Sequence, residues 1–255
     1  MSFRNIGGLI NPTASVLAGP PVCQYVIVGG GGNGGSSYAG YGSAGGGAGG
    51  VINGSGFMPV IGTTYTITVG GGGGNNSSIG SILIATGGGV GGGGGAGSPN
   101  VGNGGCGGGS AWNSTSNTVG LGTAGQGFPG GYYQSTGVAG GGGGAGGSGQ
   151  PGAVGGLPRF VNIAGFSTFF GAGGQSYPVN NYTLVPNPAV VNTGNGGDGS
   201  ANYGSASGGT GGSGIVMLAH STQYNPAAST TGSPYIGVIN GYRLYIWTAT
   251  GSITF

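Results

Sequence analysis

The sequence predicts a mainly β protein in which short antiparallel strands lie at both ends of a glycine-rich core, with no α-helix of note. Three observations lead to this fold class. Short apolar runs end directly in glycine, as in residues 25–28 (YVIV) before residues 29–32 (GGGG). Glycine accounts for 76 of the 255 residues. The apolar runs are rich in Val, Ile, Thr and Tyr, which favour strands over helices.

Residues 1–22 form the first predicted unit, an N-terminal docking arm. They end in Pro20 and Pro21, and tandem proline stops a helix and favours an extended path. The apolar side chains of this arm are candidate assembly contacts, namely Phe3, Ile6, Leu9 and Ile10. The alternative interpretation is a strand or loop that packs on its own domain.

Residues 23–214 form the second predicted unit, a glycine-rich β and polyproline II domain. In residues 65–69 (YTITV) apolar side chains alternate with threonine, the period of a half-buried strand. Residues 87–156 contain too few side chains for an ordinary core. Glycine tracts can instead adopt the polyproline II helix, and without Cβ atoms neighbouring tracts approach closely enough for backbone hydrogen bonds between them. The alternative is a flexible linker.

Residues 215–255 form the third predicted unit, a C-terminal β region. Residues 215–218 (IVML) are apolar throughout, while residues 242–247 (YRLYIW) and 253–255 (ITF) alternate. Between the last two runs, residues 250–252 (TGS) suit a short hairpin connection.

Islands of aromatic residues interrupt the glycine tracts and are the candidate receptor contacts. Loops on a rigid scaffold commonly carry recognition residues, and aromatic side chains supply contact area at a low entropic cost. The candidates are Trp112, Tyr132, Tyr133, Phe169, Phe170, Tyr177 and Tyr182. The alternative is that these side chains form the core of a chain that has little else to bury.

The near absence of charge excludes most chemical functions. Charged residues make up 2% of the chain, with three arginines, no lysine, and Asp198 as the only acid. Nucleic-acid binding requires a basic stripe, and acid–base catalysis commonly requires paired carboxylates. A metal site needs three or four ligands, whereas only Asp198, His220, Cys23 and Cys106 are present, scattered along the chain. We therefore expect no enzymatic activity, no metal, no cofactor and no nucleic-acid partner.

Other sequence features bear on location and cysteine chemistry. No run of about 20 apolar residues exists, so we expect no membrane insertion. Residues 1–19 lack the pattern of a secretory signal, so we expect synthesis in a cytoplasm. Spacing alone does not decide whether Cys23 and Cys106 pair, and we interpret them as two buried free thiols.

Three stretches carry a family resemblance. They are YVIVGGGG at residues 25–32 followed by GGGAGGV at 45–51, then GTTYTITVGGGG at 62–73, and finally GGSGIVML at 211–218 with GYRL at 241–244 and TATGSITF at 248–255. In this order of strands and glycine tracts the chain resembles glycine-rich domain proteins of bacteriophage virions, especially tail fibres and fibre-tip adhesins.

The resemblance implies a non-enzymatic virion protein that mediates attachment to the host cell surface. It implies other virion proteins as partners, with a host surface glycan or outer-membrane protein as the target, and a homo-oligomer such as a trimer. The C-terminal β region is longer than in tip adhesins of this type, and the N-terminal arm is short. A capsid decoration or head-fibre protein therefore remains as an alternative. A third reading is an ice-binding glycine-rich protein, with Thr66 and Thr68 on a flat face, although the sequence itself displays no regular threonine array.

Overall fold

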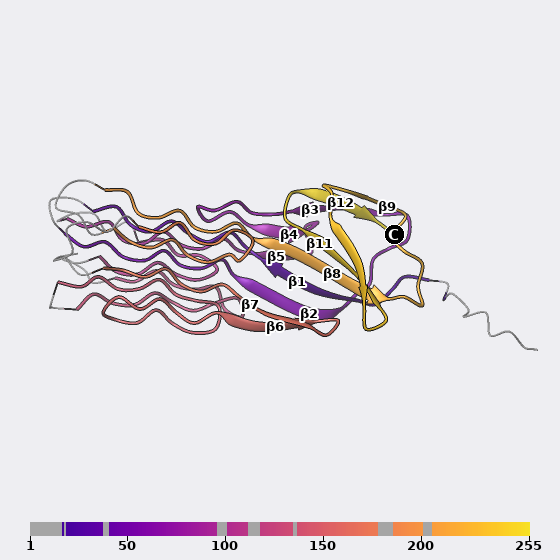
Figure 1. Cartoon of the computed structure of the whole chain (residues 1–255), viewed down its shortest axis with the longest axis horizontal. Coiled ribbons are helices and arrows are strands. Elements are labelled where there is room, and N and C mark those ends of the chain that lie inside the picture. The colour runs from indigo at the N-terminus through magenta and orange to yellow at the C-terminus, as the bar shows by residue number, and fades with distance from the viewer. Residues whose placement is uncertain are drawn as a thin grey trace, which may run out of the picture.

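The computed structural model describes residues 17, 19–37, 41–95, 101–111, 118–134, 137–177, 186–200 and 206–255. The predictions made for Phe3, Ile6, Leu9, Ile10, Trp112 and Tyr182 lie outside these residues. The described part is elongated, with the strands gathered at one end and long glycine tracts running away from them to the other (Figure 1). It contains no helix among the described residues.

Two five-stranded antiparallel sheets and one hairpin make up the strand end. The first sheet has the order β10-β11-β8-β1-β2 and the second the order β5-β4-β3-β12-β9, while β6 and β7 pair with each other. The bounds are β1 (Cys23–Val28), β2 (Val51–Phe57), β3 (Thr64–Thr68), β4 (Ser77–Ile79), β5 (Leu83–Ala85), β6 (Arg159–Ile163), β7 (Phe166–Phe170), β8 (Ile215–Ser221), β9 (Ser229–Thr231), β10 (Tyr235–Ile239), β11 (Tyr242–Trp247) and β12 (Gly251–Thr254).

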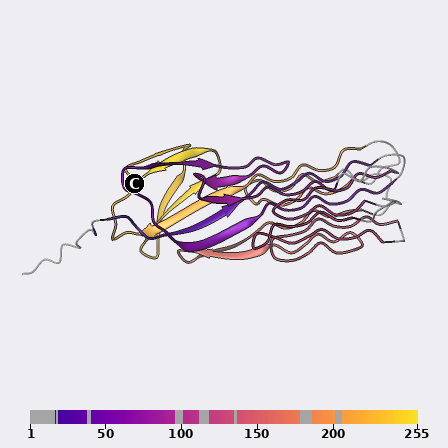
Figure 2. The ribbon, with the colours of Figure 1, turned by 180° about the vertical axis from the view of Figure 1, so that it is seen from behind.

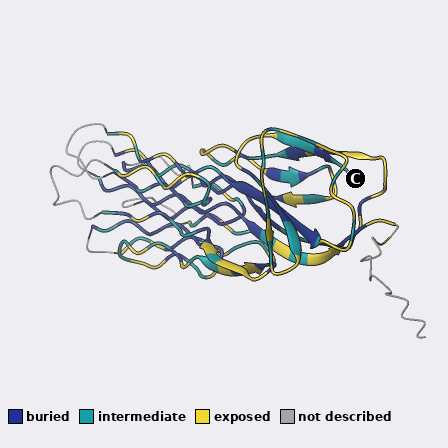
Figure 3. Cartoon of the chain, turned by 45° about the vertical axis from the view of Figure 1, so that its right-hand side comes forward, coloured by how far each residue is buried: buried dark blue, intermediate teal, exposed yellow. Residues whose placement is uncertain are grey.

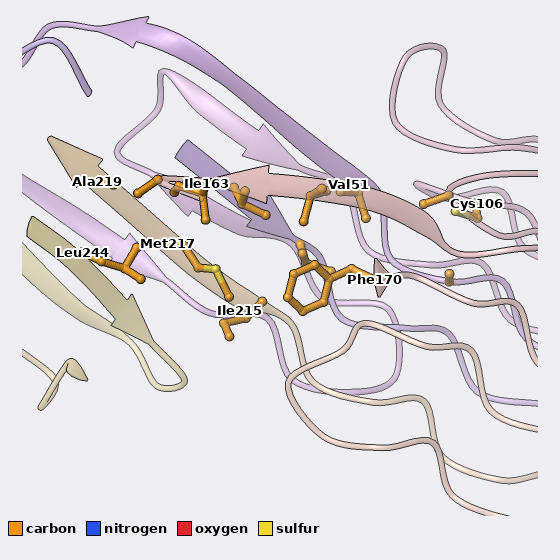
Figure 4. Packing of buried hydrophobic residues seen from close by; sticks show 14 residues of the cluster. Val51, Cys106, Ile163, Phe170, Ile215, Met217, Ala219 and Leu244 are labelled. Carbon is orange, nitrogen blue, oxygen red and sulfur yellow. The ribbon is translucent and has the colours of Figure 1, made fainter. Parts of the chain in front are cut away.

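The central strands of the first sheet, β1 and β8, are largely buried on both faces, which explains why they lack polar alternation. One face packs on the second sheet through a cluster that includes Ile27, Ile67, Trp247 and Ile253. The other face packs under the β6–β7 hairpin through a second cluster, in which Ile163 and Phe170 of the hairpin lie with Met217 and Leu244 (Figure 4). The strand end is therefore a sandwich with a hairpin as a third, partial layer.

Strands from the two ends of the described chain share the same sheets, which corrects the expected arrangement. β8 pairs with β1, and β12 pairs with β3. Residues 215–255 therefore do not form a unit apart from the earlier strands. The strands also lie on one side of the glycine tracts rather than on both. The order of the strands along the chain does not predict this arrangement, because the glycine tracts leave the sandwich and return to it.

The glycine tracts run back and forth side by side, and both views show them as a bundle of extended segments (Figures 1 and 2). Their backbone hydrogen bonds repeat every three residues. Between tract 29–35 and tract 44–50, the N–H groups of every third residue donate across the bundle at 2.8–2.9 Å. These bonds run from Gly29 to Gly50, from Gly32 to Gly47, and from Gly35 to Ala44.

Tract 43–50 lies at the centre of the bundle and is bonded to neighbours on every side. Its N–H groups donate to three other tracts, and the direction repeats every three residues. Ser43, Gly46 and Gly49 donate to residues 200, 197 and 194. Ala44, Gly47 and Gly50 donate to residues 92, 89 and 86, while Gly45 and Ala48 donate to residues 140 and 143. Its carbonyl groups accept from residues 29–35, from Cys106 and Gly109, and from Gly174. Every residue of this tract is buried, and Figure 3 shows buried segments running through the bundle.

The bundle has no room for side chains at most of its glycines. A Cβ atom on Gly46 would overlap the carbonyl oxygen of Gly32, and one on Gly47 would overlap the carbonyl oxygen of Cys106. Real Cβ atoms do not come this close to backbone atoms. Glycine is therefore required in the centre of the bundle for the spacing between tracts.

Polar side chains join the bundle to the sandwich. The Arg159 guanidinium, at the start of β6, donates to the carbonyl oxygens of Val51 at 2.7 Å and Ala145 at 3.1 Å. The Gln126 side chain accepts from the Thr86 N–H at 2.8 Å and donates to the Ile84 carbonyl at 3.1 Å. These side chains satisfy backbone groups where the regular pairing of strands gives way to the pairing of tracts.

Candidate functional site

The end of the bundle away from the sandwich carries the predicted tyrosines. Tyr132 and Tyr133 end one tract, and Tyr132 is 52% exposed whereas Tyr133 is half-buried. Tyr177 ends another tract and is also half-buried. The tracts that carry these tyrosines both bond to residues 139–141. The Gly131 N–H donates to the Gly141 carbonyl at 2.8 Å, and the Ser176 hydroxyl donates to the Ala139 carbonyl. The structure thus brings these three tyrosines to the same end of the molecule.

Tyr177 is held by the single acid of the chain. Its hydroxyl donates to one carboxylate oxygen of Asp198 at 3.2 Å, and the Gln175 N–H donates to the other at 2.9 Å. Partial burial raises the pKa of Tyr177, and the neighbouring Asp198 charge raises it further. The ring is therefore fixed as a neutral phenol.

A buried serine cluster ties the neighbouring tracts together at this end. The Ser43 hydroxyl donates to the Gly35 carbonyl at 2.6 Å, and the Ser200 N–H donates to the Ser43 hydroxyl at 2.7 Å. The Ser200 hydroxyl accepts from the Ser37 N–H at 2.7 Å. Both Ser43 and Ser200 are fully buried. This cluster could not be predicted from the sequence, since isolated serines in a glycine-rich chain give no signal of pairing.

The two phenylalanines of the candidate set lie elsewhere. Both belong to β7 in the hairpin at the strand end, so they are not at the tyrosine end (Figure 1). Phe169 is 59% exposed and packs edge to face on Phe160 at a ring distance of 5.2 Å. Phe170 is 5% exposed and belongs to the core, so its prediction as a surface contact is wrong. Strand alternation places these neighbours on opposite faces.

The outer face of the second sheet presents rows of hydroxyl groups. In one row Thr66 of β3 faces Ser252 of β12, which faces Thr231 of β9. In the next row Thr64 faces Thr254, and their hydroxyl groups bond to each other at 2.8 Å. The Thr231 and Ser252 hydroxyls also bond at 2.8 Å. A regular hydroxyl array therefore exists, although it was not visible in the sequence because distant strands supply the rows.

The single histidine of the chain lies in β8 at the strand end. His220 is fully buried, with the Tyr245 ring stacked at 5.8 Å and the Phe255 ring at 5.7 Å. Burial lowers its pKa, and the Arg243 charge adds to the shift, whereas a bond from its Nδ1 to the Ser221 carbonyl opposes it. Asp198 is held by Gln175 and Tyr177, so the structure does not pair it with His220.

Both cysteines are buried free thiols, in agreement with their interpretation from the sequence. Burial raises the pKa of Cys23 and that of Cys106 to about 12, so neither thiol is a ready nucleophile. Within the described ranges, no group of three or more His, Cys, Asp or Glu side chains could hold a metal ion. Among these same residues, no helix is long and apolar enough to cross a membrane.

Comparison with known proteins places the chain by its sequence. The family model described as "Glycine-rich domain" matches residues 11–221. Searches of curated proteins and of solved structures each found no match. The family match covers the whole glycine bundle together with the strands from β1 to β8. Because this is well over half of its length, the chain belongs to the glycine-rich domain family.

Proposed function

We propose that the chain is a structural protein of a bacteriophage virion, a tail fibre or fibre-tip component that attaches the particle to the host cell surface. The observation that carries this proposal is the division of the molecule. An elongated bundle, built almost without side chains, runs away from the strand sandwich (Figure 1), and the tracts that end in Tyr132, Tyr133 and Tyr177 are bonded together in it. In this proposal the sandwich end contacts other virion proteins, and the tyrosine end contacts a surface glycan or outer-membrane protein.

The glycine tracts are, in this proposal, polyproline II helices. The three-residue step of the hydrogen bonds supports this assignment, because a polyproline II helix has three residues per turn and no internal hydrogen bonds. Each side of such a helix meets a different neighbour, as the three donor directions of tract 43–50 require. The bundle then acts as a stiff spacer with little charge to attract unrelated partners, since Asp198 is the single charged side chain of its tracts.

Locating the chain on intact phage particles is the first test. Antibody raised against the purified protein and labelled with gold would be imaged on particles by electron microscopy. Label at a tail or fibre tip is the expected result. Label spread over the capsid would replace attachment by the decoration role, and absence of label from particles would refute a virion role altogether.

A second test separates the tyrosine end from the hairpin. Phage carrying the double substitution Tyr132→Ala and Tyr133→Ala should adsorb to host cells at least about tenfold more slowly, since central aromatic contacts dominate interfaces. Phage carrying Phe169→Ala is the control, because Phe169 is an aromatic residue about as exposed as Tyr132 but lies on the hairpin. Equal loss in the control, or no loss in the double variant, would contradict attachment through the tyrosine end.

The hydroxyl rows of the second sheet support a second candidate function, binding to an ice surface. Thr64, Thr66 and Thr231 form part of these rows, and neighbouring strands space such rows by about 4.8 Å. Measurement of thermal hysteresis tests this function. The wild-type protein should show hysteresis, Thr66→Lys in the array should remove most of it, and Val60→Lys outside the array should keep it. Absence of hysteresis in the wild type would refute ice binding.

A further inference from the structure

β10 forms the outer edge of the first sheet. It pairs with β11 on one side, and no other described strand pairs with it on the other side. Edge strands leave N–H and C=O groups open to pairing, and proteins usually protect them with charge, proline or a bulge. The five residues of β10, YIGVI, contain none of these.

The hairpin that joins β10 to β11 determines which backbone groups face outward. Ile239 pairs with Tyr242 across the two-residue loop Asn240-Gly241, whose φ angles of 48° and 77° suit a type I′ turn. In such a hairpin the residues that flank the loop exchange both hydrogen bonds, and every second pair along the ladder does the same. Tyr235, Gly237 and Ile239 therefore bond to β11. The N–H and C=O groups of Ile236 and Val238 point away from the sheet.

The side chains of β10 are exposed and apolar on both faces. Tyr235, Ile236 and Val238 are 65%, 50% and 65% exposed. On the hairpin side, Tyr235 and Ile239 line a cavity of about 270 Å³ together with Phe166 of β7. The Tyr235 ring lies over Gly237, where an added Cβ would come within 2.8 Å of its hydroxyl.

We propose that β10 pairs antiparallel with β10 of a second copy of this chain, about a two-fold axis through Gly237. In this register Ile236 of each copy faces Val238 of the other, and these are the residues whose backbone groups point outward. The pairing makes four hydrogen bonds, two on each side of the axis, and leaves Gly237 facing Gly237. Tyr235 then faces Ile239 of the other copy, an aromatic and β-branched pair that stabilises antiparallel sheets.

The symmetry of the strand favours a second copy over another partner. The outward-pointing groups lie one residue on either side of Gly237, so a single antiparallel register satisfies all of them at once. Two-fold interfaces use the same patch on both copies. Gly237 suits the axis, because the pair that lacks mutual hydrogen bonds brings its Cα atoms to about 4.5 Å. The two copies would join their first sheets into one continuous sheet.

Charge and area set the expected strength of this dimer. β10 has no charged residue, and the nearest charge is Arg243 on β11, opposite Val238. The contact is limited to the exposed side chains of β10 and to four backbone hydrogen bonds, so the interface belongs to the small, reversible class. We expect a dissociation constant in the micromolar range.

Sedimentation velocity of the full chain tests the dimer over a range of concentrations. The wild type should pass from monomer to dimer at micromolar concentration. Val238→Lys places a charge at the paired edge and should weaken the dimer at least tenfold. Val60→Lys is the matched control, since Val60 is 64% exposed and lies outside β10, and it should dimerise as the wild type does. A monomer at every concentration, a trimer, or equal weakening in both variants would overturn the proposal.

A cross-link tests the position of the axis independently. Gly237→Cys should form a disulfide-linked dimer under mild oxidation, because residues that meet on a two-fold axis at this separation have disulfide geometry. The native thiols do not compete, since Cys23 and Cys106 are buried. Val60→Cys should stay largely unlinked. Failure of Gly237→Cys to link faster than Val60→Cys, in protein with a native circular dichroism spectrum, would overturn the two-fold register.

Discussion

The sandwich and the glycine bundle solve the problem of burial in opposite ways. In the sandwich, large side chains such as Trp247, Tyr245 and Ile67 fill the space between layers. In the bundle, tract 43–50 is buried just as completely, but backbone hydrogen bonds to its neighbours replace side-chain packing. The sandwich is thus stabilised by packed side chains, whereas the bundle requires that its glycines have no side chain. Removal of side-chain atoms should damage the first, and addition of them should damage the second.

The largest effect is expected from adding one methyl group to the bundle. Gly46→Ala should destabilise the protein by more than about 4 kcal/mol, because its Cβ would overlap the Gly32 carbonyl and rigid tracts surround it. Gly147→Ala is the matched control, since the nearest atoms lie 3.7–4.0 Å from its Cβ, and it should change stability by less than about 1 kcal/mol. Thermal and denaturant unfolding measure both. Similar values for the two variants would mean that the tracts can move apart.

Removal of side-chain atoms from the sandwich should have the next largest effect. Ile67→Ala should cost about 2–5 kcal/mol, since Ile67 is fully buried between the two sheets. Ile84→Ala on the exposed side of β5 is the control and should cost less than about 1 kcal/mol. Denaturant unfolding, followed at a separate wavelength for each of the two regions, would also show whether the sandwich and the bundle unfold together. A small loss for Ile67→Ala would indicate that the bundle dominates the stability of the whole chain.

Acidification should act on the sandwich through His220. The pKa of His220 is lowered in the folded protein, chiefly by burial, while an unfolded histidine titrates near about 6.5. Below that pH the unfolded state binds the proton more readily, so stability is full above about pH 6.5 and falls as the pH decreases further. His220 is the only histidine, so His220→Gln should abolish the fall between about pH 6.5 and 5.5. Melting temperatures across this range provide the measurement, and an unchanged pH profile in the variant would contradict the assignment.

The smallest effect is expected at the tyrosine end of the bundle. Tyr177→Phe removes the 3.2 Å hydrogen bond to Asp198 and should cost about 1 kcal/mol, because the pair is only partly buried. Tyr132→Phe, on a more exposed ring, should cost less than about 0.5 kcal/mol. Differential scanning calorimetry can resolve both changes. A loss of stability for Tyr132→Phe as large as that for Tyr177→Phe would show that the hydrogen bond to Asp198 contributes no specific stability.

The strands were the predictable part of the fold. Their apolar runs and threonine alternation depend on local periodicity, so the regions of β1, β3, β8 and β11 were located correctly from the sequence. Which strands pair was not fully predictable, because one partner of β1 and one partner of β3 lie more than 180 residues further along the chain. The register of the glycine tracts was equally hidden. One glycine resembles another, and only the packed bundle distinguishes Gly46 from Gly147.

The candidate site was predictable only as a list of residue types. Aromatic residues among glycines stood out, and three of the tyrosines do lie at one end of the bundle. The same criterion also selected Phe170, which strand alternation directs into the core. The link between Tyr177 and Asp198 spans 21 residues, and the hydroxyl rows join three strands. Contacts between residues this far apart depend on the topology, which local patterns do not encode.

The position of β8 between β1 and β11 has a consequence for synthesis on the ribosome. β1 is made early, but one of its two partners is β8, near the end of the chain. In the same way, the N–H groups of Gly31 and Gly34 donate to Gly212 and Gly209. Contacts of such long sequence separation slow folding. Neither region can therefore complete its structure until nearly the whole chain has emerged, and the nascent glycine tracts must remain soluble until that moment.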